Sequence, residues 1–188
     1  MSGRRGRRPS SAPRSQHFLG SSRLAAEIAA SAGIGPQDLV VEFGAGYGRL
    51  TEQLGRRAGR VIAVELDVRL ASRLRSRLGA HSHIAVVTGD VLDVPLPNRP
   101  FKVVSNLPFH ATSTVLHRLL DDPGLPLVRA DLVVAWGAAL AVTVVFGPAH
   151  KARPWTNRYE FLLLRRLSAI LFDPPPGTDA ALISIRPR

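Results

Sequence analysis

Short apolar runs alternate with stretches of helical periodicity from residue 22 onward. Runs of branched and aromatic residues that are too short for helices predict buried strands, and apolar residues three or four apart predict helices. The predicted strands are 39–43, 61–65, 84–88, 102–106, 131–136, 159–166 and 180–186, and the predicted helices are 22–32, 49–58, 67–78 and 111–121. This alternation predicts one α/β domain with a mostly parallel sheet and helices on both faces.

The segment 137–157 is ambiguous, because its alanines favour a helix whereas residues 142–145 (VTVV) favour a strand. We expect a helix followed by a loop. Residues 132–149 carry no charge over 18 positions, which is close to the length that spans a membrane. Two glycines, a threonine and a proline interrupt the stretch, so a buried strand followed by a core helix is the favoured interpretation and a membrane span the alternative.

The composition is that of one domain: 188 residues, 45% of them hydrophobic, can form a single core. The absence of cysteine excludes disulfides and thiolate metal sites, and a cytoplasmic location is the simplest expectation. The first residues, MSGRRGRRPSSAPR, place arginines where a secretory signal requires apolar residues. We therefore expect a flexible arginine-rich arm at 1–14 and a folded domain at 15–188.

The formal net charge is +11, from 25 basic and 14 acidic residues. Such an excess predicts a polyanionic partner, because neutralised phosphates release counterions and add affinity without sequence preference. A GC-rich genome explains arginine in place of lysine, but it does not explain the excess over acidic residues. The charge therefore predicts nucleic-acid binding and does not distinguish RNA from DNA.

A glycine-rich loop, EFGAGYG (42–48), lies between a predicted strand and a predicted helix. Glycines at 44, 46 and 48 let the backbone turn sharply and approach a ligand beside a helix N-terminus. A dinucleotide fingerprint requires glycine where this chain has Arg49, which argues against NAD. A plain tight turn is the alternative.

Two acidic residues end the next two predicted strands. Glu65 follows Gly44 by 21 residues, the distance at which an acid accepts ribose hydroxyls in such sheets. Asp90 ends the third strand and can accept from an adenine amino group. The carboxyl edge of a parallel sheet is where ligands bind, so we expect the loop and both acids in one site. Solvated acids at strand ends are the alternative.

Six motifs, SQHFL (15–19), EFGAGYG, VELD (64–67), GDV (89–91), NLPF (106–109) and FDPPPGTDAALISIR (172–186), occur in this order. Together they resemble the S-adenosylmethionine-dependent rRNA adenine N6-methyltransferases, the family of KsgA and the Erm resistance enzymes. NLPF after an apolar strand is the most specific of them. The resemblance implies the Rossmann-like, seven-stranded fold of class I methyltransferases and S-adenosylmethionine as cofactor.

The resemblance also assigns residues. Those implied to contact the cofactor are His17, Leu19, Gly44, Ala45, Gly46, Glu65, Leu66, Asp90, Val91 and Asn106, with Glu42 ordering the glycine loop from behind. The first two would line the methionine end, Glu65 the ribose and Asp90 the adenine. Family members often have asparagine where this chain has His17. No metal site is expected, because His81 and His83 have no third ligand nearby.

The NLPF motif suggests how the reaction proceeds. The exocyclic nitrogen of adenine shares its lone pair with the ring, so it is a poor nucleophile. The Asn106 oxygen and a carbonyl near Leu107 would accept hydrogen bonds from its two N–H groups and localise that lone pair on the nitrogen. Pro108 would fix the chain, and Phe109 would stack on an extruded base, worth roughly 1–3 kcal/mol. These four are the expected catalytic residues, and a strand-end asparagine beside a packed phenylalanine is the alternative.

The favoured interpretation is an Erm-like enzyme that methylates one adenine of 23S rRNA, free or in the assembling large subunit, and gives resistance to macrolides, lincosamides and streptogramin B. A KsgA-like enzyme acting on 16S rRNA and a non-catalytic rRNA-binding assembly factor are the alternatives. A DNA adenine methyltransferase is less favoured, because those enzymes have aspartate in place of Asn106. We expect a monomer without a membrane partner.

Family members usually continue into a small helical domain that helps to hold RNA, and this chain stops at Arg188, so we expect no such domain. RNA binding would then fall to the arm, through Arg4, Arg5, Arg7, Arg8 and Arg14. The further candidates are Arg49, Arg118, Arg129, Lys151, Arg153 and Arg158, and surface charge without a function is the alternative for each.

Overall fold

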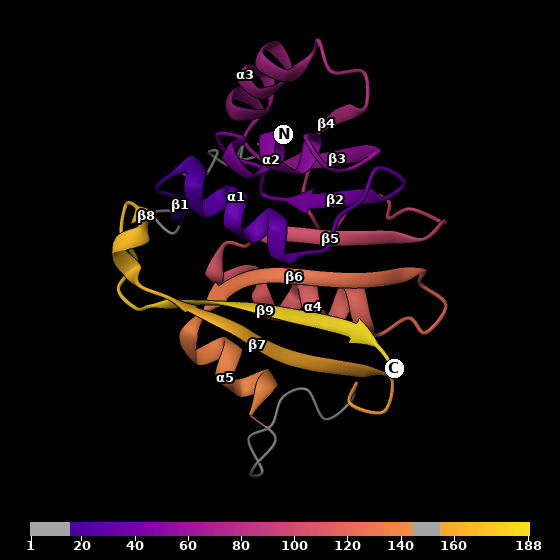
Figure 1. Ribbon diagram of the computed structural model, residues 1–188, viewed down its shortest axis with the longest axis vertical. Helices are drawn as coiled ribbons and strands as arrows, with labels where there is room; N and C mark the ends of the chain where they lie inside the picture. Colours follow the sequence, from indigo (N-terminus) through magenta and orange to yellow (C-terminus); the bar gives the residue numbers. More distant parts are fainter. Residues whose placement is uncertain (1–15, 145–154) are drawn as a thin grey trace, which may run out of the picture.

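A seven-stranded sheet forms the centre of the molecule in the order β4-β3-β2-β5-β6-β9-β7 (Figure 1). The structure is a computed structural model that describes residues 16–144 and 155–188. The strands are β2 (Leu39–Phe43), β3 (Arg60–Glu65), β4 (Ile84–Thr88), β5 (Phe101–Asn106), β6 (Leu127–Ala135), β7 (Tyr159–Leu167) and β9 (Ala180–Pro187). β9 runs antiparallel to both of its neighbours, β6 and β7, and the other neighbouring pairs in this sheet are parallel. The predicted mostly parallel sheet is confirmed.

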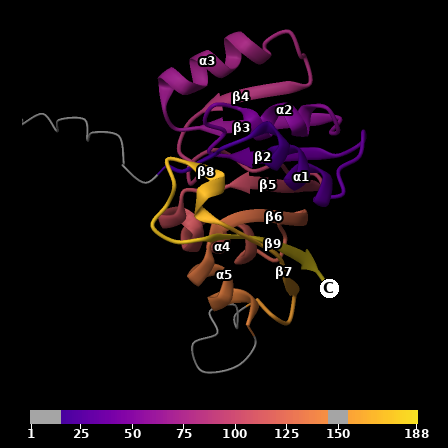
Figure 2. The same ribbon diagram turned by 60° about the vertical axis from the view of Figure 1, so that its left-hand side comes forward.

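Helices cover both faces of the sheet. They are α1 (Ser22–Ser31), α2 (Arg49–Gly55), α3 (Val68–Leu78), α4 (Thr112–Leu120) and α5 (Trp136–Thr143), with short 3-10 turns at η1 (Phe109–Ala111) and η2 (Ala169–Leu171). Successive strand residues face opposite sides: Val104 packs in one core with α1 and α2, and Val103 packs in the other with α4 and α5. In both views α3 lies beside β4 at one end of the molecule, and α5 lies near β7 (Figures 1 and 2).

Some boundaries differ from the prediction. β6 begins at Leu127 instead of Asp131, and Trp136, predicted to end that strand, begins α5. The early part of β6 was missed because Arg129 breaks the apolar run, although its charge is neutralised by Asp131. Helix α2 ends at Gly55, before the predicted 58, since the Leu54 carbonyl accepts from the backbone N–H groups of Arg57 and Ala58 and closes the helix.

The apolar segment 132–149 forms the end of β6 and then α5, as expected for its described part, residues 132–144. Residues 145–154 lie outside the described residues. Within 16–144 and 155–188, every helix is too short or too polar to cross a bilayer.

A second, two-stranded sheet was not predicted. Strand β1 (Phe18–Leu19) pairs antiparallel with β8 (Phe172–Asp173), and the Gly20 N–H donates to the Leu171 carbonyl at 2.7 Å. Two-residue strands are too short to leave a periodic pattern in the sequence. The pairing brings SQHFL and FDPPPG together, so the two outermost motifs form one structural unit (Figure 1).

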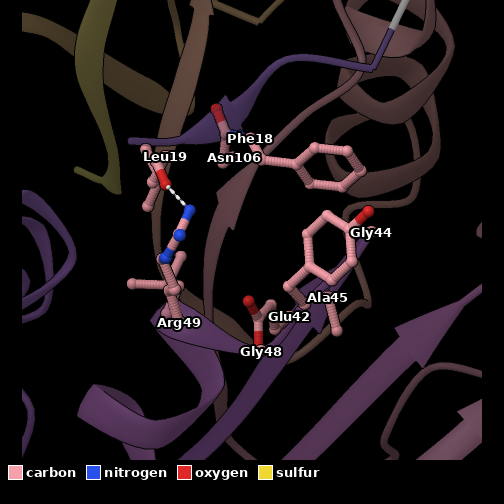
Figure 3. Close-up of a pocket in the computed structure, with 10 residues that line it drawn as sticks. Phe18, Leu19, Glu42, Gly44, Ala45, Gly48, Arg49 and Asn106 are labelled. Carbon is pink, nitrogen blue, oxygen red and sulfur yellow. Dashed lines mark hydrogen bonds between the residues drawn. The ribbon is translucent and has the colours of Figure 1, made fainter. Parts of the chain in front are cut away.

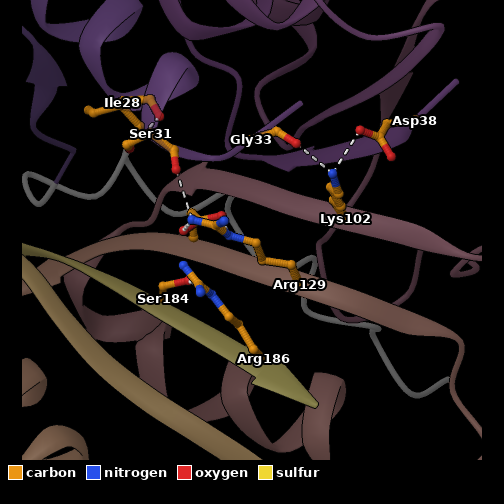
Figure 4. A network of polar contacts seen from close by, with 9 residues as sticks. Ile28, Ser31, Gly33, Asp38, Lys102, Arg129, Ser184 and Arg186 are labelled. Atoms are coloured by element: carbon orange, nitrogen blue, oxygen red, sulfur yellow. Dashed lines mark hydrogen bonds and ion pairs between the residues drawn. The ribbon is translucent and has the colours of Figure 1, made fainter. Parts of the chain in front are cut away.

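A buried ion pair joins the sheet to α1 at the amino end of β6 (Figure 4). Arg129 donates to both oxygens of Asp131 at 2.6 and 2.8 Å, and its Nη2 also donates to the Ser31 carbonyl at 2.8 Å. The Asp131 side chain is 1% exposed. Close by, Lys102 donates to Asp38 and to the Gly33 carbonyl, both at 2.7 Å. Arg129 is therefore part of the scaffold.

We expect Arg129→Met to lower the free energy of unfolding by about 3–5 kcal/mol, because it leaves the Asp131 carboxylate buried without a partner. Urea denaturation measures this. The double variant R129M/D131L, which removes both charges, should recover most of the loss. Arg23→Met, which breaks an exposed pair with Glu27, is the control and should change little. A small effect of Arg129→Met would contradict the assigned role.

Candidate functional site

A cavity of about 490 Å³ opens at the carboxyl edge of the sheet. Its walls come from the ends of four neighbouring strands and from the segment before β1. The lining residues are Gln16, Phe43, Gly44, Val64, Glu65, Leu66, Asp67, Gly89, Asp90, Val91, Leu92, Leu107, Pro108, His110, Ala111 and Thr114. The structure therefore gathers the predicted residues Gly44, Glu65, Leu66, Asp90 and Val91 around one space, with Leu107 and Pro108 opposite.

The glycine-rich loop depends on its glycines for conformation and for room. Gly44, Gly46 and Gly48 have φ values of +70°, +53° and +76°, in the left-handed region. A Cβ atom on Gly46 would lie 2.6 Å from the Phe18 ring. The backbone N–H groups of Gly44 and Ala45 donate to the Val64 carbonyl at 2.8 and 3.0 Å. Gly44 lines the large cavity, whereas Ala45 lines a smaller one beside it.

Glu65 is buried, with 1% of its surface exposed, so it is not a solvated acid at a strand end. Its Oε2 accepts from the Gly46 N–H at 2.7 Å, and its Oε1 accepts from the Asp67 N–H at 2.9 Å. One carboxylate thus fixes both the glycine loop and the turn into α3. Each oxygen has a second acceptor position, which leaves capacity for a ligand in the cavity that the residue lines.

The loop after β4 contains Asp90, and a hydrogen bond from a side chain of α4 anchors this loop. The Asp90 Oδ1 accepts from the Leu92 N–H at 2.9 Å, and the residue lines the cavity. Arg118, on α4, donates from Nη2 to the Val94 carbonyl, and its pKa is lowered by burial. Arg118 was an RNA-binding candidate, and in the structure it ties the Asp90 loop to the opposite wall of the cavity.

Asn106 has one satisfied and one unsatisfied polar atom. Its Nδ2 donates to the His17 carbonyl at 2.8 Å, which orients the amide, and its Oδ1 is buried without a hydrogen-bond partner. The side chain lines a small cavity of about 20 Å³ that shares Gly44, Glu65, Leu107 and Pro108 with the large one. A buried acceptor without a donor costs about 1–3 kcal/mol. The fold therefore keeps a strong acceptor ready beside the cavity.

The segment before α1 forms one wall of the small cavity beside the glycine loop (Figure 3). The Leu19 carbonyl accepts from Arg49 Nη1 at 2.5 Å, and the His17 ring nitrogen Nδ1 lies 2.8 Å from the Pro174 carbonyl oxygen. The Phe18 ring packs against the Tyr47 ring at a centroid distance of 4.6 Å. His17 and Leu19 thus line one small cavity each, their contacts with a cofactor stay a prediction, and Phe18, which lines both small cavities, was not predicted from the sequence.

Phe109 is placed differently from the other NLPF residues. It is partly buried, its ring lies 5.5 Å from the His17 ring with a tilt of 44°, and it lines neither the large cavity nor the two small ones, whereas Asn106 lines both small cavities and Leu107 and Pro108 line the large one. Its expected role in stacking on a base stays a prediction. The Pro108 carbonyl accepts from the Ala111 N–H at 2.8 Å, which shapes the turn after the motif.

Glu42 is buried behind the glycine loop, where it accepts from the Thr51 hydroxyl at 2.6 Å. Burial away from water raises the pKa of Glu42 to about 8, and the nearby charge of Glu65 acts in the same direction. The side chain is therefore neutral at pH 7. It ties the end of β2 to α2 and lines a small cavity with Gly44 and Ala45, and its role in ordering the loop stays a prediction.

The predicted RNA-binding residues of the arm, Arg4, Arg5, Arg7, Arg8 and Arg14, lie outside the described residues, as do Lys151 and Arg153. Arg158, a further candidate, donates to the Leu120 carbonyl at 2.5 Å. Within the described ranges no group of three or more histidine or acidic residues could hold a metal ion.

Comparisons with known proteins agree with this geometry. The profile of the family described as ribosomal RNA adenine dimethylase matches residues 12–188. An rRNA adenine N-6-methyltransferase of Bacillus licheniformis is 33% identical over 170 residues, 90% of this chain and 59% of the relative. A probable ribosomal RNA small subunit methyltransferase A of Methanosarcina mazei is 38% identical over 179 residues, 92% of this chain and 64% of the relative. The chain thus spans about three fifths of the length of these relatives.

The crystal structure of the 23S rRNA methyltransferase ErmE superposes with a TM-score of 0.81 at 32% identity, covering 91% of this chain and 70% of that one. This likeness confirms the class I methyltransferase fold that the motifs implied.

We expect the stability of the wild-type protein to decrease between about pH 5 and pH 8. Glu42 has an ordinary pKa of 4.5 when unfolded and about 8 when folded, so across this range the folded state binds more protons. The free energy of unfolding should fall by roughly 1.4 kcal/mol per pH unit relative to Glu42→Gln, which cannot ionise. Urea denaturation at several pH values measures the difference.

Glu160→Gln is the matched control, since Glu160 is exposed on β7, and it should follow the wild-type profile. Parallel profiles for the wild type and Glu42→Gln would contradict the raised pKa.

Proposed function

Because the chain belongs to the ribosomal RNA adenine dimethylase family, we propose that it transfers methyl groups from S-adenosylmethionine to the N6 atom of an adenine in rRNA. The observation that carries the proposal is Asn106, whose buried Oδ1 has no partner beside the carboxyl-edge cavity. An acceptor in that state is suited to a ligand N–H group, and the adenine amino group offers two.

The residues around the cavity fit the cofactor. The cavity volume of about 490 Å³ is in the range of small-molecule sites. Glu65 would accept from the ribose hydroxyls, Asp90 from the adenine amino group, and Gly44 would let the backbone approach. His17 and Leu19 would enclose the methionine end. When bound, S-adenosylmethionine supplies an electrophilic methyl group on a sulfonium.

The chain's own residues would activate and position the acceptor. Asn106 Oδ1 would accept a hydrogen bond from one N6–H group, which draws the nitrogen lone pair out of conjugation and directs it toward the cavity. The carbonyl near Leu107 would accept a hydrogen bond from the other N6–H group, and Pro108 holds that segment against Gly44, where a Cβ atom would lie 3.5 Å from the proline Cδ. The nitrogen loses its proton after it has formed the new bond, so no general base is required before transfer. Phe109 would stack on the extruded base.

We further propose 23S rRNA as the substrate, with resistance to macrolides, lincosamides and streptogramin B as the consequence. The likeness to ErmE supports this choice, as does phenylalanine at 109, where KsgA-like enzymes generally have tyrosine. The second candidate is dimethylation of 16S rRNA, which the 38% identity to the small subunit methyltransferase of M. mazei favours. A non-catalytic assembly factor would bind rRNA without methyl transfer.

We expect the purified chain to transfer labelled methyl groups from S-adenosylmethionine to protein-free 23S rRNA in preference to 16S rRNA and duplex DNA. Scintillation counting of the three substrates side by side, followed by mapping of the modified adenine, measures this. Preferential labelling of 16S rRNA would support the second candidate. Tight rRNA binding without any transfer would favour the assembly factor and refute the enzyme.

We expect Asn106→Ala to lower kcat by a factor of roughly 100–1,000, because one preorganised polar contact to the reacting nitrogen is lost. Affinity for S-adenosylhomocysteine, measured by calorimetry, should stay within a few-fold of the wild type. Asn98→Ala, at an exposed loop asparagine, is the control and should leave both quantities unchanged. If Asn106→Ala abolished cofactor binding and spared transfer at saturation, the role assigned to the amide would be wrong.

A further inference from the structure

The arginines of the described chain divide into two groups. Most donate from the guanidinium to a protein group: Arg23, Arg49, Arg57, Arg75, Arg77, Arg118, Arg129, Arg158, Arg165, Arg166, Arg186 and Arg188. Within residues 16–144 and 155–188, five make no guanidinium hydrogen bond or ion pair: Arg56, Arg60, Arg69, Arg73 and Arg99. Within the described ranges, these five guanidinium groups therefore have all of their donors available to a partner.

Two of these free arginines lie next to the cavity. Leu66 and Asp67 line its rim, and Arg69 and Arg73 follow on α3. Their four-residue spacing places them on the same side of the helix. Both lie near enough to lower the pKa of Asp67, but neither comes within ion-pair distance of it. The other two arginines of α3 bond to the protein, since Arg75 donates to the Val86 carbonyl and Arg77 pairs with Glu52.

The N-terminal end of a helix carries a partial positive charge, so cations in the first turns are unfavourable. Arg69 and Arg73 occupy the first two turns of α3, where the acid beside them is the N-cap Asp67, whose carboxylate accepts from the Arg69 and Leu70 N–H groups. Beside them, Leu66 and Val68 are large apolar side chains with 59% and 67% of their surface exposed. Two free guanidinium groups and two exposed apolar side chains thus lie within residues 66–73 at the start of α3, which is at one end of the molecule (Figures 1 and 2).

We propose that this α3 surface, formed by Leu66, Val68, Arg69 and Arg73, contacts the sugar-phosphate backbone of the substrate RNA outside the target nucleotide. The inference rests on the proposed rRNA substrate. The guanidinium groups bind phosphate oxygens, for which their forked geometry is suited, and the apolar side chains contact ribose. Such contacts position the RNA and carry no base specificity. The surface lies on the Glu65 side of the cavity, whereas Asn106 lies across it, so RNA held here spans the mouth of the site.

The matched test compares two double substitutions of equal charge. The test variant, Arg69→Gln/Arg73→Gln, removes the two positive charges of α3. The control variant, Arg56→Gln/Arg60→Gln, removes the charges of two free, exposed arginines at the end of α2 and the start of β3, at the opposite edge of the sheet. Binding of a 23S rRNA transcript is measured by fluorescence anisotropy between 50 and 200 mM KCl.

We expect the α3 variant to bind RNA roughly tenfold more weakly and to reduce the slope of log K against log salt by about 1 to 2 units, as two lost phosphate contacts require. Its KM for RNA should rise, while kcat and the modified adenine stay unchanged. Arg69→Lys/Arg73→Lys should restore the salt slope, because it restores the charge. The Arg56/Arg60 variant should resemble the wild type.

Equal salt slopes for the two glutamine variants would overturn the inference, as would a loss of S-adenosylhomocysteine affinity in the α3 variant, since the arginines would then act on the cavity through Asp67. A different result would refute the proposed function, namely the absence of methyl transfer by the wild-type chain. The comparison of RNA binding between the two variants could still be made in that case.

Discussion

The arrangement of the site depends on one buried carboxylate. Glu65 accepts from the backbone of the glycine loop through one oxygen and from the turn into α3 through the other, so it joins the ends of β2 and β3. A buried charge is tolerated only when polar partners surround it, and here the partners are the Gly46 N–H in the left-handed glycine loop and the Asp67 N–H in the turn into α3. The loop conformation, the position of α3 and the shape of the cavity therefore follow from the same interaction.

The two sides of the cavity hold their acceptors in different ways. On the side of β3 and β4, the carboxylates of Glu65 and Asp90 accept from backbone N–H groups and keep further acceptor positions for a ligand. On the side of β5, the Asn106 amide donates to the His17 carbonyl, and its Oδ1 has no bond. Both sides thus present oriented acceptors, and a preorganised acceptor needs no rearrangement during a reaction.

The sequence predicted those features that repeat or that chemistry restricts. Apolar runs identified the seven strands, since each is long enough to show its period, and the acids at the end of β3 and after β4 indicated the edge of the sheet where the cavity opens. It could not predict the β1–β8 pair, because a two-residue strand is defined only by its partner. It also could not separate bonded from free arginines. In the sequence, Arg118 and Arg129 look like ordinary surface arginines. In the structure, Arg118 donates to the Val94 carbonyl and Arg129 donates to the Asp131 carboxylate.

The pairing of β1 with β8 has a consequence for biosynthesis. The contact between the His17 ring and the Pro174 carbonyl joins positions 157 residues apart, and β9, the last strand in the chain, inserts between β6 and β7. A chain emerging from the ribosome can form the glycine loop early, but the roof over Asn106 has no anchor until residues 172–174 have been made. The glycine loop and the roof over Asn106 are therefore completed at different stages of synthesis, the loop first and the roof only once residues 172–174 are present.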